Sequence, residues 1–132
     1  MLIIDETDKT TIHLTRGDRI EHLAFYLPIK LQDGTIQNYI FKVGDKISFI
    51  VKEKKGYDKP EVFRKDFFIE EETEYPEINL QGTETKWGEI LNKRATYWYD
   101  IVLNDDITIL GFDENGAKQI YLYPEGGEFN GN

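Results

Sequence analysis

The stretch Tyr97-Trp98-Tyr99-Asp100-Ile101-Val102-Leu103 decides the fold class of this chain. It is rich in aromatic and β-branched residues, contains neither Gly nor Pro, and repeats its apolar residues with a period of two. These features are typical of a half-buried strand. The residues expected on its inner face are Tyr97, Tyr99, Ile101 and Leu103. Trp98 and Asp100 alternate with them, so we expect these two to face solvent, a second layer or a partner.

Shorter segments of the same character lie on both sides of this strand. They are predicted at residues 10–15, 20–29, 36–41, 46–52, 62–69, 78–80, 107–112 and 117–123, and residues 1–4 add an edge strand. The residues expected to point inward are Ile12, Leu14, Leu23, Phe25, Leu27, Ile29, Ile47, Phe49, Val51, Phe67 and Ile69. Asp33-Gly34 predicts a hairpin with a primed turn, and Asn115-Gly116 predicts a second hairpin between the last two segments. Short strands at this spacing indicate a β-sandwich or barrel.

Residues 82–93 are the one place where a helical turn is expected. Trp87, Ile90 and Leu91 are spaced to share one face of a helix, and Gly88 limits that helix to one or two turns. Leu91 precedes Tyr97, and a tyrosine that opens a strand can hydrogen-bond back to the preceding connection, as in a tyrosine corner. This arrangement favours an all-β fold, an immunoglobulin-like β-sandwich with one short helical turn.

The composition bounds the organisation and the partners. The chain of 132 residues suffices for one domain, and we expect an N-terminal arm at 1–9, a β-sandwich domain at 10–124 and a C-terminal tail at 125–132. The net charge of -9 disfavours nucleic acid and anionic membranes as partners. The chain has no Cys, which excludes disulfides and thiolate chemistry. No segment approaches the roughly 20 apolar residues of a membrane span, so we expect a soluble protein.

The titratable residues form no recognisable catalytic pattern. The two histidines, His13 and His22, lie in predicted strands, and no nucleophile motif accompanies them. Asp113-Glu114-Asn115-Gly116 resembles the start of a calcium loop, but Pro124 stands where the loop requires its last Glu, so we interpret it as a turn. Arg16-Gly17-Asp18 is likewise interpreted as a tight turn. We expect no enzyme activity, no cofactor and no metal site.

Aromatic residues are the remaining candidates for function. Trp98 points away from the expected core, and an exposed Trp is typical of an interface. The residues that we expect to contact a partner are Trp98, Asp100 and Trp87. Two interpretations stay open: contact with another protein, or stacking of aromatic rings, including Tyr121 and Tyr123, against sugar.

The order of short motifs along the chain resembles that of a known family. The motifs are Thr-Arg-Gly-Asp (15–18), Val-Gly-Asp (43–45), Phe-Ile-Val-Lys (49–52), Lys-Asp-Phe (65–67), Thr85-Lys86, Leu91, the 97–103 strand, Thr108-Ile109 and the closing segment. Over roughly residues 10 to 124 this order looks like small β-sandwich domains encoded in tailed phages and prophages of Gram-positive bacteria. It is similar to the N-terminal domain of phage baseplate upper proteins. The most specific element is Tyr-x-Tyr-Asp-Ile-x-Leu in the 97–103 strand.

The resemblance implies a structural role in a virion. The chain would be made in the bacterial cytoplasm and would lie in a tail or baseplate, as a non-catalytic module that contacts other tail or baseplate proteins and forms homo-oligomers. Family members often have a Gly just before the Tyr-x-Tyr strand, where this chain has residues 92–95, Asn-Lys-Arg-Ala. The geometry of that turn therefore differs from the family pattern. The alternative function is a carbohydrate-binding module that recognises host cell-surface polysaccharide.

Overall fold

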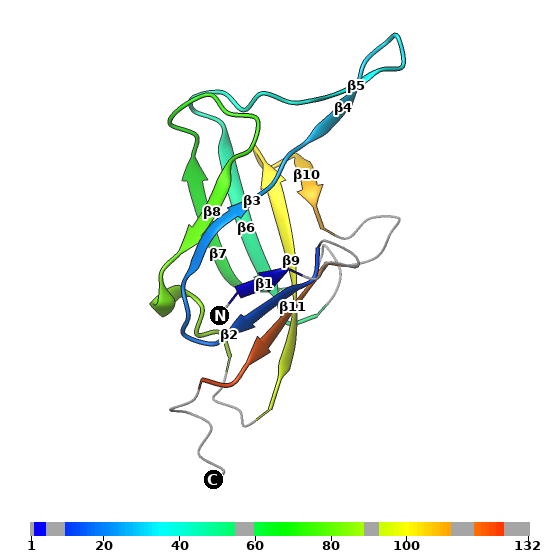
Figure 1. Cartoon of the computed structure of the whole chain (residues 1–132). Helices are drawn as coiled ribbons and strands as arrows, with labels where there is room; N and C mark the ends of the chain where they lie inside the picture. Colours follow the sequence, from blue (N-terminus) through cyan, green and yellow to red (C-terminus); the bar gives the residue numbers. More distant parts are fainter. Residues whose placement is uncertain (1, 5–9, 55–59, 89–92, 112–117, 126–132) are drawn as a thin grey trace.

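The computed structural model describes residues 2–4, 10–54, 60–88, 93–111 and 118–125. Within them the protein is all-β, as predicted, and its helical structure is one turn of 3₁₀ helix, η1 (Gly82–Glu84) (Figure 1). The strands are β1 (Leu2–Ile4), β2 (Ile12–Thr15), β3 (Ile20–Ala24), β4 (Pro28–Lys30), β5 (Ile36–Asn38), β6 (Lys46–Lys52), β7 (Glu61–Phe68), β8 (Glu77–Leu80), β9 (Ala95–Leu103), β10 (Ile107–Leu110) and β11 (Lys118–Tyr123).

Strand β9 is the centre of a seven-stranded sheet, where it lies between β6 and β11. From one edge the order is β1-β2-β11-β9-β6-β7, and β10 also pairs with β9. Strands β11 and β2 run parallel, whereas β9 is antiparallel to all its neighbours. Strand β1 forms the edge expected of the first residues. Residues 5–9 of the predicted arm and 126–132 of the predicted tail lie outside the described residues.

The core fills the space between this main sheet and the two-stranded β3–β8 sheet, which crosses in front of it in Figure 1. The alternation predicted for β9 is confirmed, because Tyr97, Tyr99, Ile101 and Leu103 are each no more than 5% exposed. The other buried apolar residues on β2, β6, β11, β3 and β8 that pack with them are Ile12, Leu14, Ile47, Phe49, Val51, Ile120, Leu122, Ile20, Ile78 and Leu80. Removal of this apolar surface from water is the main favourable term in folding.

Strand β6 is buried on both faces, which its alternation did not predict. The expected inward residues are buried, and so are Ser48, Ile50 and Lys52 on the outer face. The Ser48 hydroxyl donates a 2.6 Å hydrogen bond to Asp66 on β7, and Lys52 forms an ion pair with Asp100 on β9. Both buried polar side chains therefore have partners on neighbouring strands, as such groups require.

The β4–β5 hairpin forms as predicted, but its turn is not of the primed type. A primed turn of the Asp-Gly kind needs a positive φ at both residues, and here Gly34 alone of the two has one, at 90°. Asp33 instead accepts a 2.9 Å hydrogen bond from the Thr35 N–H through its carboxylate. The Leu31 N–H donates to the Thr35 carbonyl, which closes a longer loop with Gly34 in the left-handed position.

The second predicted hairpin, between segments 107–112 and 117–123, is wrong. Strand β10 pairs with the C-terminal part of β9, and β11 pairs with its N-terminal part. The two strands therefore follow one another along the same edge of β9 and do not pair with each other. With nine residues, β9 is long enough to hold both. The Asn115-Gly116 turn itself lies outside the described residues.

In the described part of residues 82–93, the helical turn does not include Trp87, which was expected on its apolar face. Element η1 ends at Glu84, and Trp87 follows in non-helical chain, while Ile90 and Leu91 lie outside the described residues. Gly88 has a φ of 71°, in the left-handed region that a right-handed helix does not contain. The side chain of Trp87 reaches the core without a helix, because it packs against Phe63 and Tyr97.

Candidate interaction surface

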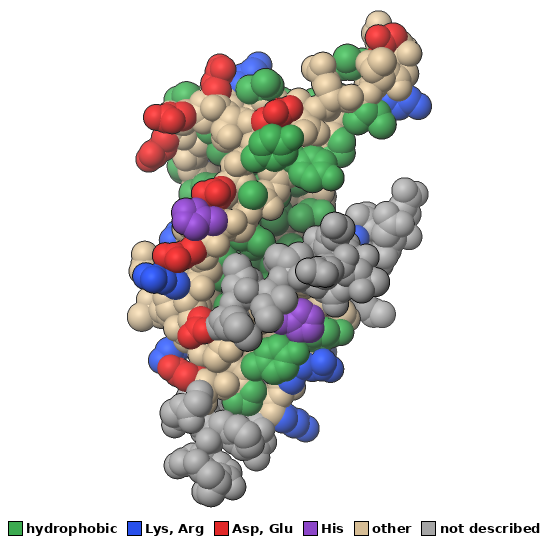
Figure 2. All heavy atoms as spheres, viewed as in Figure 1, with side chains coloured by type: hydrophobic (Ala, Val, Ile, Leu, Met, Phe, Trp, Pro, Cys, Tyr) green, Lys and Arg blue, Asp and Glu red, His purple; other side chains and the backbone are tan. Residues whose placement is uncertain are grey.

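Exposed large apolar side chains gather at one end of the molecule, which we call the hairpin end. Its members lie on the β4–β5 hairpin, on the segments at its base and on the adjoining turns of the main sheet. They are Tyr26, Leu31, Ile36, Ile40, Val43, Phe68, Tyr75 and Ile107. Figure 2 shows apolar side chains along the projecting hairpin and at its base, with acidic side chains beside them. Among the described residues, Val62 is the one exposed large apolar side chain outside this group.

The β4–β5 hairpin projects from the body, and its two strands pair with each other alone among the described strands (Figure 1). Ile36 at the start of β5 is 69% exposed. An isolated two-stranded hairpin is marginally stable in water, and an exposed apolar patch marks a site of association. The hairpin is anchored at its base, where the Tyr39 N–H donates to the Leu27 carbonyl and Asn38 donates a 3.2 Å hydrogen bond to the Tyr75 hydroxyl.

Asp45 holds the base of the hairpin end together. Its carboxylate accepts hydrogen bonds from the Tyr39 hydroxyl at 2.8 Å, the Lys42 N–H at 2.9 Å and the Asn104 amide at 3.2 Å. Burial raises the pKa of Asp45, but these hydrogen bonds outweigh it, so the pKa lies below its ordinary value. The hydrogen bond to Asp45 raises the pKa of Tyr39 in turn. The hydrogen bonds to Asp45 therefore hold the chain segments beneath this surface in place.

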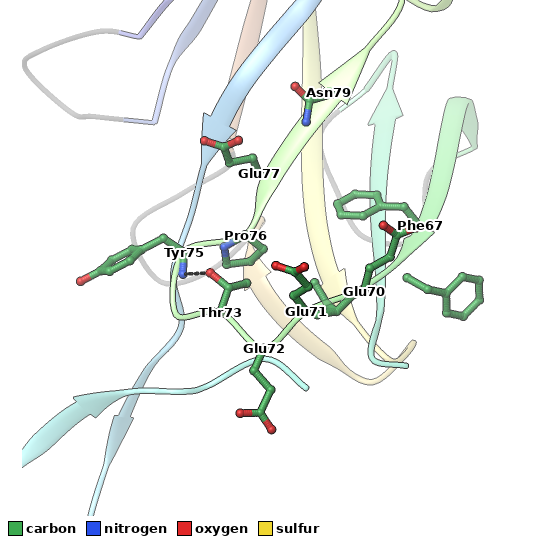
Figure 3. A pocket seen from close by; sticks show the side chains of 11 residues that line it. Phe67, Glu70, Glu71, Glu72, Thr73, Tyr75, Pro76, Glu77 and Asn79 are labelled. Atoms are coloured by element: carbon green, nitrogen blue, oxygen red, sulfur yellow. Dashed lines mark hydrogen bonds between the residues drawn. The ribbon is translucent and has the colours of Figure 1, made fainter. Parts of the chain in front are cut away.

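A groove of about 610 Å³ opens at the same end, along the connection from β7 to β8 (Figure 3). Its apolar lining comes from Phe67, Phe68, Tyr75 and Pro76, and its acidic lining from residues 70–72 and Glu77. Phe68 is 61% exposed. In the described part of the chain, no Lys or Arg forms an ion pair with the glutamates at 70–72. Glu77 accepts a hydrogen bond from His22 at 2.9 Å.

The three residues predicted to contact a partner are not brought together. Trp98 lies half-buried on the outer face of β9. Asp100 lies on the same face, with its carboxylate 2.8 Å from Lys52 Nζ and its side chain 13% exposed. Trp87 is 5% exposed and lies on the opposite side of the sheet, inside the core. Trp98 and Asp100 thus share a surface, whereas Trp87 contributes to packing.

The outer face also carries an aromatic cluster on β2 and β11. His13 Nδ1 lies 2.9 Å from the Tyr123 hydroxyl, and the His13 ring meets that of Tyr121 edge to face at 5.1 Å. The guanidinium of Arg94 lies 4.0 Å from the Tyr121 ring centroid, within the range of a cation–π interaction. One face of Tyr121 is therefore already occupied, which leaves less ring surface for a sugar.

The Arg16-Gly17-Asp18 segment forms the predicted tight turn, closed by the Asp18 N–H to the Thr15 carbonyl at 3.0 Å. Gly17 supplies the positive φ of 90°. The Arg16 side chain lies against the segment that contains Trp87, and its Nε donates a 3.3 Å hydrogen bond to the Trp87 carbonyl. Its guanidinium therefore stabilises the chain around Trp87.

Sequence reasoning missed the residues of the hairpin end, although a signal was present. Two adjacent pairs of large apolar residues, Ile40-Phe41 and Phe67-Phe68, break the two-residue period. In extended chain such neighbours point to opposite faces, so one member of each pair must face outward. Phe41 is fully buried, whereas Ile40 and Phe68 are exposed.

The described residues contain no group of three or more His, Asp or Glu side chains placed to hold a metal ion. No helix in the described part of the chain has the length and apolar character needed to cross a membrane. A scan against protein-family models, a search of curated proteins and a search of solved structures each found no match to this chain.

Proposed function

We propose that this chain is a non-catalytic structural component of a phage or prophage virion, in the tail or baseplate, and that it acts through protein–protein contacts at the hairpin end. The observation that carries the proposal is the concentration of exposed apolar side chains on and around a projecting hairpin. Burial of such a patch against another protein releases roughly 25 cal/mol per Å² of apolar surface. The phage assignment rests on the motif resemblance.

We also infer that the fold is an immunoglobulin-like sandwich. In the variable type of that fold, one sheet contains the strands lettered G, F, C and C′, and the other contains B and E. The neighbours β11-β9-β6-β7 and the β3–β8 pair support this correspondence, with β9 in the place of strand F. Tyr97 lies near the start of β9, and its hydroxyl abuts Gly88 in the preceding connection, which supports a tyrosine-corner position.

Electron microscopy tests the proposal directly. Particles released by induction of the strain that encodes the chain are labelled with a gold-conjugated antibody against this protein. We expect label at the tail or baseplate. Intact particles without label would contradict the virion assignment.

A pair of variants tests the surface. Ile36→Ser with Ile40→Ser removes two apolar contacts of the hairpin end, whereas Val62→Ser removes an exposed apolar side chain elsewhere. We expect the double variant to lose incorporation into particles and Val62→Ser to retain it, while thermal unfolding shows both to be folded. Equal incorporation of the two variants into particles would show that the hairpin end is not the surface that contacts other virion proteins.

The carbohydrate-binding alternative has one supporting observation, the aromatic cluster of His13, Tyr121 and Tyr123 near Trp98 on the outer face. Stacking of a sugar there would quench Trp98 fluorescence when cell-wall polysaccharide is added. A Trp98→Phe variant identifies the responding residue. No change at millimolar sugar would exclude this alternative.

A further inference from the structure

We propose that the groove along the β7–β8 connection receives an extended, lysine- or arginine-rich segment of a neighbouring protein, which pairs with the free edge of β7. This inference deepens the proposed function, since it names the chemistry of the partner at the hairpin end. Three features of the described residues support it: an unpaired strand edge, an acidic lining and exposed aromatic side chains.

Strand β7 is an edge strand of the main sheet, and among the described strands it pairs with β6 alone. Residues 61–66 of this strand are guarded against strand addition by charge: Arg64 bridges Glu61 and Asp66, and Lys65 points inward to Glu84 at 3.0 Å. Its last residue, Phe68, is exposed and lines the groove. The unguarded part of the edge is therefore the part that faces the groove.

The acidic lining sets the charge of the occupant. Glu70, Glu71, Glu72 and Glu77 all line the groove, and Figure 3 shows the first three along the connection and Glu77 at the start of β8. The chain as a whole carries a net charge of -9, so the field at this groove attracts cations. A second copy of this chain carries the same net charge of -9, which disfavours it as the occupant. A cationic segment of a different protein would neutralise the negative charge of these glutamates.

The aromatic side chains indicate an extended peptide in preference to a small cation. Phe67, Phe68 and Tyr75 offer apolar contact area beside the glutamates. A strand added to an edge points alternate side chains to opposite faces, so one set can contact Phe68 while the other reaches the carboxylates. Main-chain hydrogen bonds to β7 would supply affinity, and the alternation would supply specificity.

The test uses two synthetic peptides, acetyl-(Lys-Val)₃-amide and acetyl-(Glu-Val)₃-amide, added to the full-length ¹⁵N-labelled protein. We expect the lysine peptide to shift the amide resonances of residues 66–77 and the glutamate peptide to leave them unchanged. Binding of both peptides alike, or shifts confined to other residues, would overturn the inference.

Two variants distinguish the contribution of the glutamate charges to peptide binding from that of apolar contact with Phe68. Replacement of Glu70, Glu71 and Glu72 by Gln should weaken lysine-peptide binding about tenfold, because each lost surface ion pair contributes about 0.5 kcal/mol. Phe68→Ser should weaken it while keeping the charge. Replacement of Glu21, an exposed carboxylate outside the groove, by Gln is the matched control and should bind as the parent does. Undiminished binding by the triple variant would contradict the proposed role of the groove.

Particle incorporation distinguishes this inference from the function on which it rests. If the triple Gln variant enters particles as the parent does while Ile36→Ser with Ile40→Ser does not, the groove is excluded and the hairpin end stands. If antibody finds no protein on any particle, the virion assignment fails, whereas peptide binding still decides whether the groove takes a cationic strand.

Discussion

Lys52 Nζ lies 2.8 Å from Asp100 Oδ2, and this ion pair joins β6 to β9 on the outer face of the main sheet with side chains that are 6% and 13% exposed. Removal of two charges from water is costly, and their mutual attraction offsets that cost only while both are present. The pair therefore explains why an outward position of β6 is occupied by a buried lysine.

The first prediction concerns this pair. Lys52→Met leaves the Asp100 carboxylate buried without its partner, and we expect it to lower the free energy of unfolding by about 3 kcal/mol. The double variant Lys52→Met with Asp100→Leu removes both charges and should recover most of that loss. Urea unfolding of the parent, both single variants and the double variant measures the coupling. Additive losses in the double variant would show that the two side chains do not depend on each other.

A second prediction concerns Gly88 and Tyr97. A Cβ at residue 88 would collide with the Tyr97 hydroxyl, and the φ of 71° is itself unfavourable for other residues. We expect Gly88→Ala to cost about 3 kcal/mol of stability from collision and backbone strain together. In a Tyr97→Phe background the colliding oxygen is gone, so the same substitution should cost about 1 kcal/mol.

Gly34 provides the matched control for this prediction. It has a positive φ of 90°, but an added Cβ would meet nothing within 4 Å. Gly34→Ala should therefore cost about 1 kcal/mol, from backbone strain alone, in either background. If thermal unfolding gives Gly88→Ala and Gly34→Ala the same cost, the contact with Tyr97 does not constrain residue 88.

The third prediction is a pH dependence at His22. The hydrogen bond to Glu77, together with that residue's negative charge, raises the His22 pKa above its ordinary value of 6.5. The resulting stabilisation is fully present below pH 6.5 and is lost as the pH rises through the higher pKa of the folded state. NMR titration should show the elevated His22 pKa in the parent and a lower His22 pKa in Glu77→Gln. An unchanged pKa in that variant would assign the shift to another group.

The sequence correctly predicted the features that depend on local residue patterns, such as the alternation of apolar and polar residues. The inner face of β9, the turn at residues 16–18 and the existence of the β4–β5 hairpin all follow from local patterns. It failed where pairing depends on distant segments. Local turn chemistry at residues 115–116 indicated a hairpin, but nothing local revealed that β9 is long enough to pair with β10 and β11 in succession.

At the candidate site, too, local patterns were predicted correctly and contacts between distant segments were not. Alternation correctly placed Trp98 and Asp100 on the outer face, yet it could not show that the Lys52 side chain on the neighbouring strand reaches Asp100. Trp87 was grouped with the candidate partner-binding residues because it is a large aromatic residue, whereas its ring is buried in the core. The hairpin end depends on which side of each element remains uncovered, and that is a property of the assembled fold.

The fourth prediction concerns the support of the hairpin end. Because the hydrogen bonds to Asp45 hold its pKa below the ordinary value, they contribute stability that is present at neutral pH and is lost as the pH falls through the folded-state pKa. Asp45→Asn keeps the shape but removes the charge, and we expect it to lower the free energy of unfolding at pH 7 by about 1 kcal/mol. The difference between parent and variant should stay constant from pH 7 to near the ordinary value of 3.8 and then shrink as the pH falls through the lower folded-state pKa, because protonated Asp45 is also neutral.

Urea unfolding of both proteins across this pH range measures that difference. Hydrogen exchange at pH 7 should also show faster exchange at the Lys42 amide, which donates to Asp45 at 2.9 Å. Asp33→Asn is the control, because Asp33 too has a lowered pKa from hydrogen bonds, to Thr35, but lies in the hairpin turn away from the base. If Asp45→Asn keeps a constant deficit even as the pH falls through the folded-state pKa of Asp45 in the parent, the charge of Asp45 is not what holds Tyr39, Lys42 and Asn104 together.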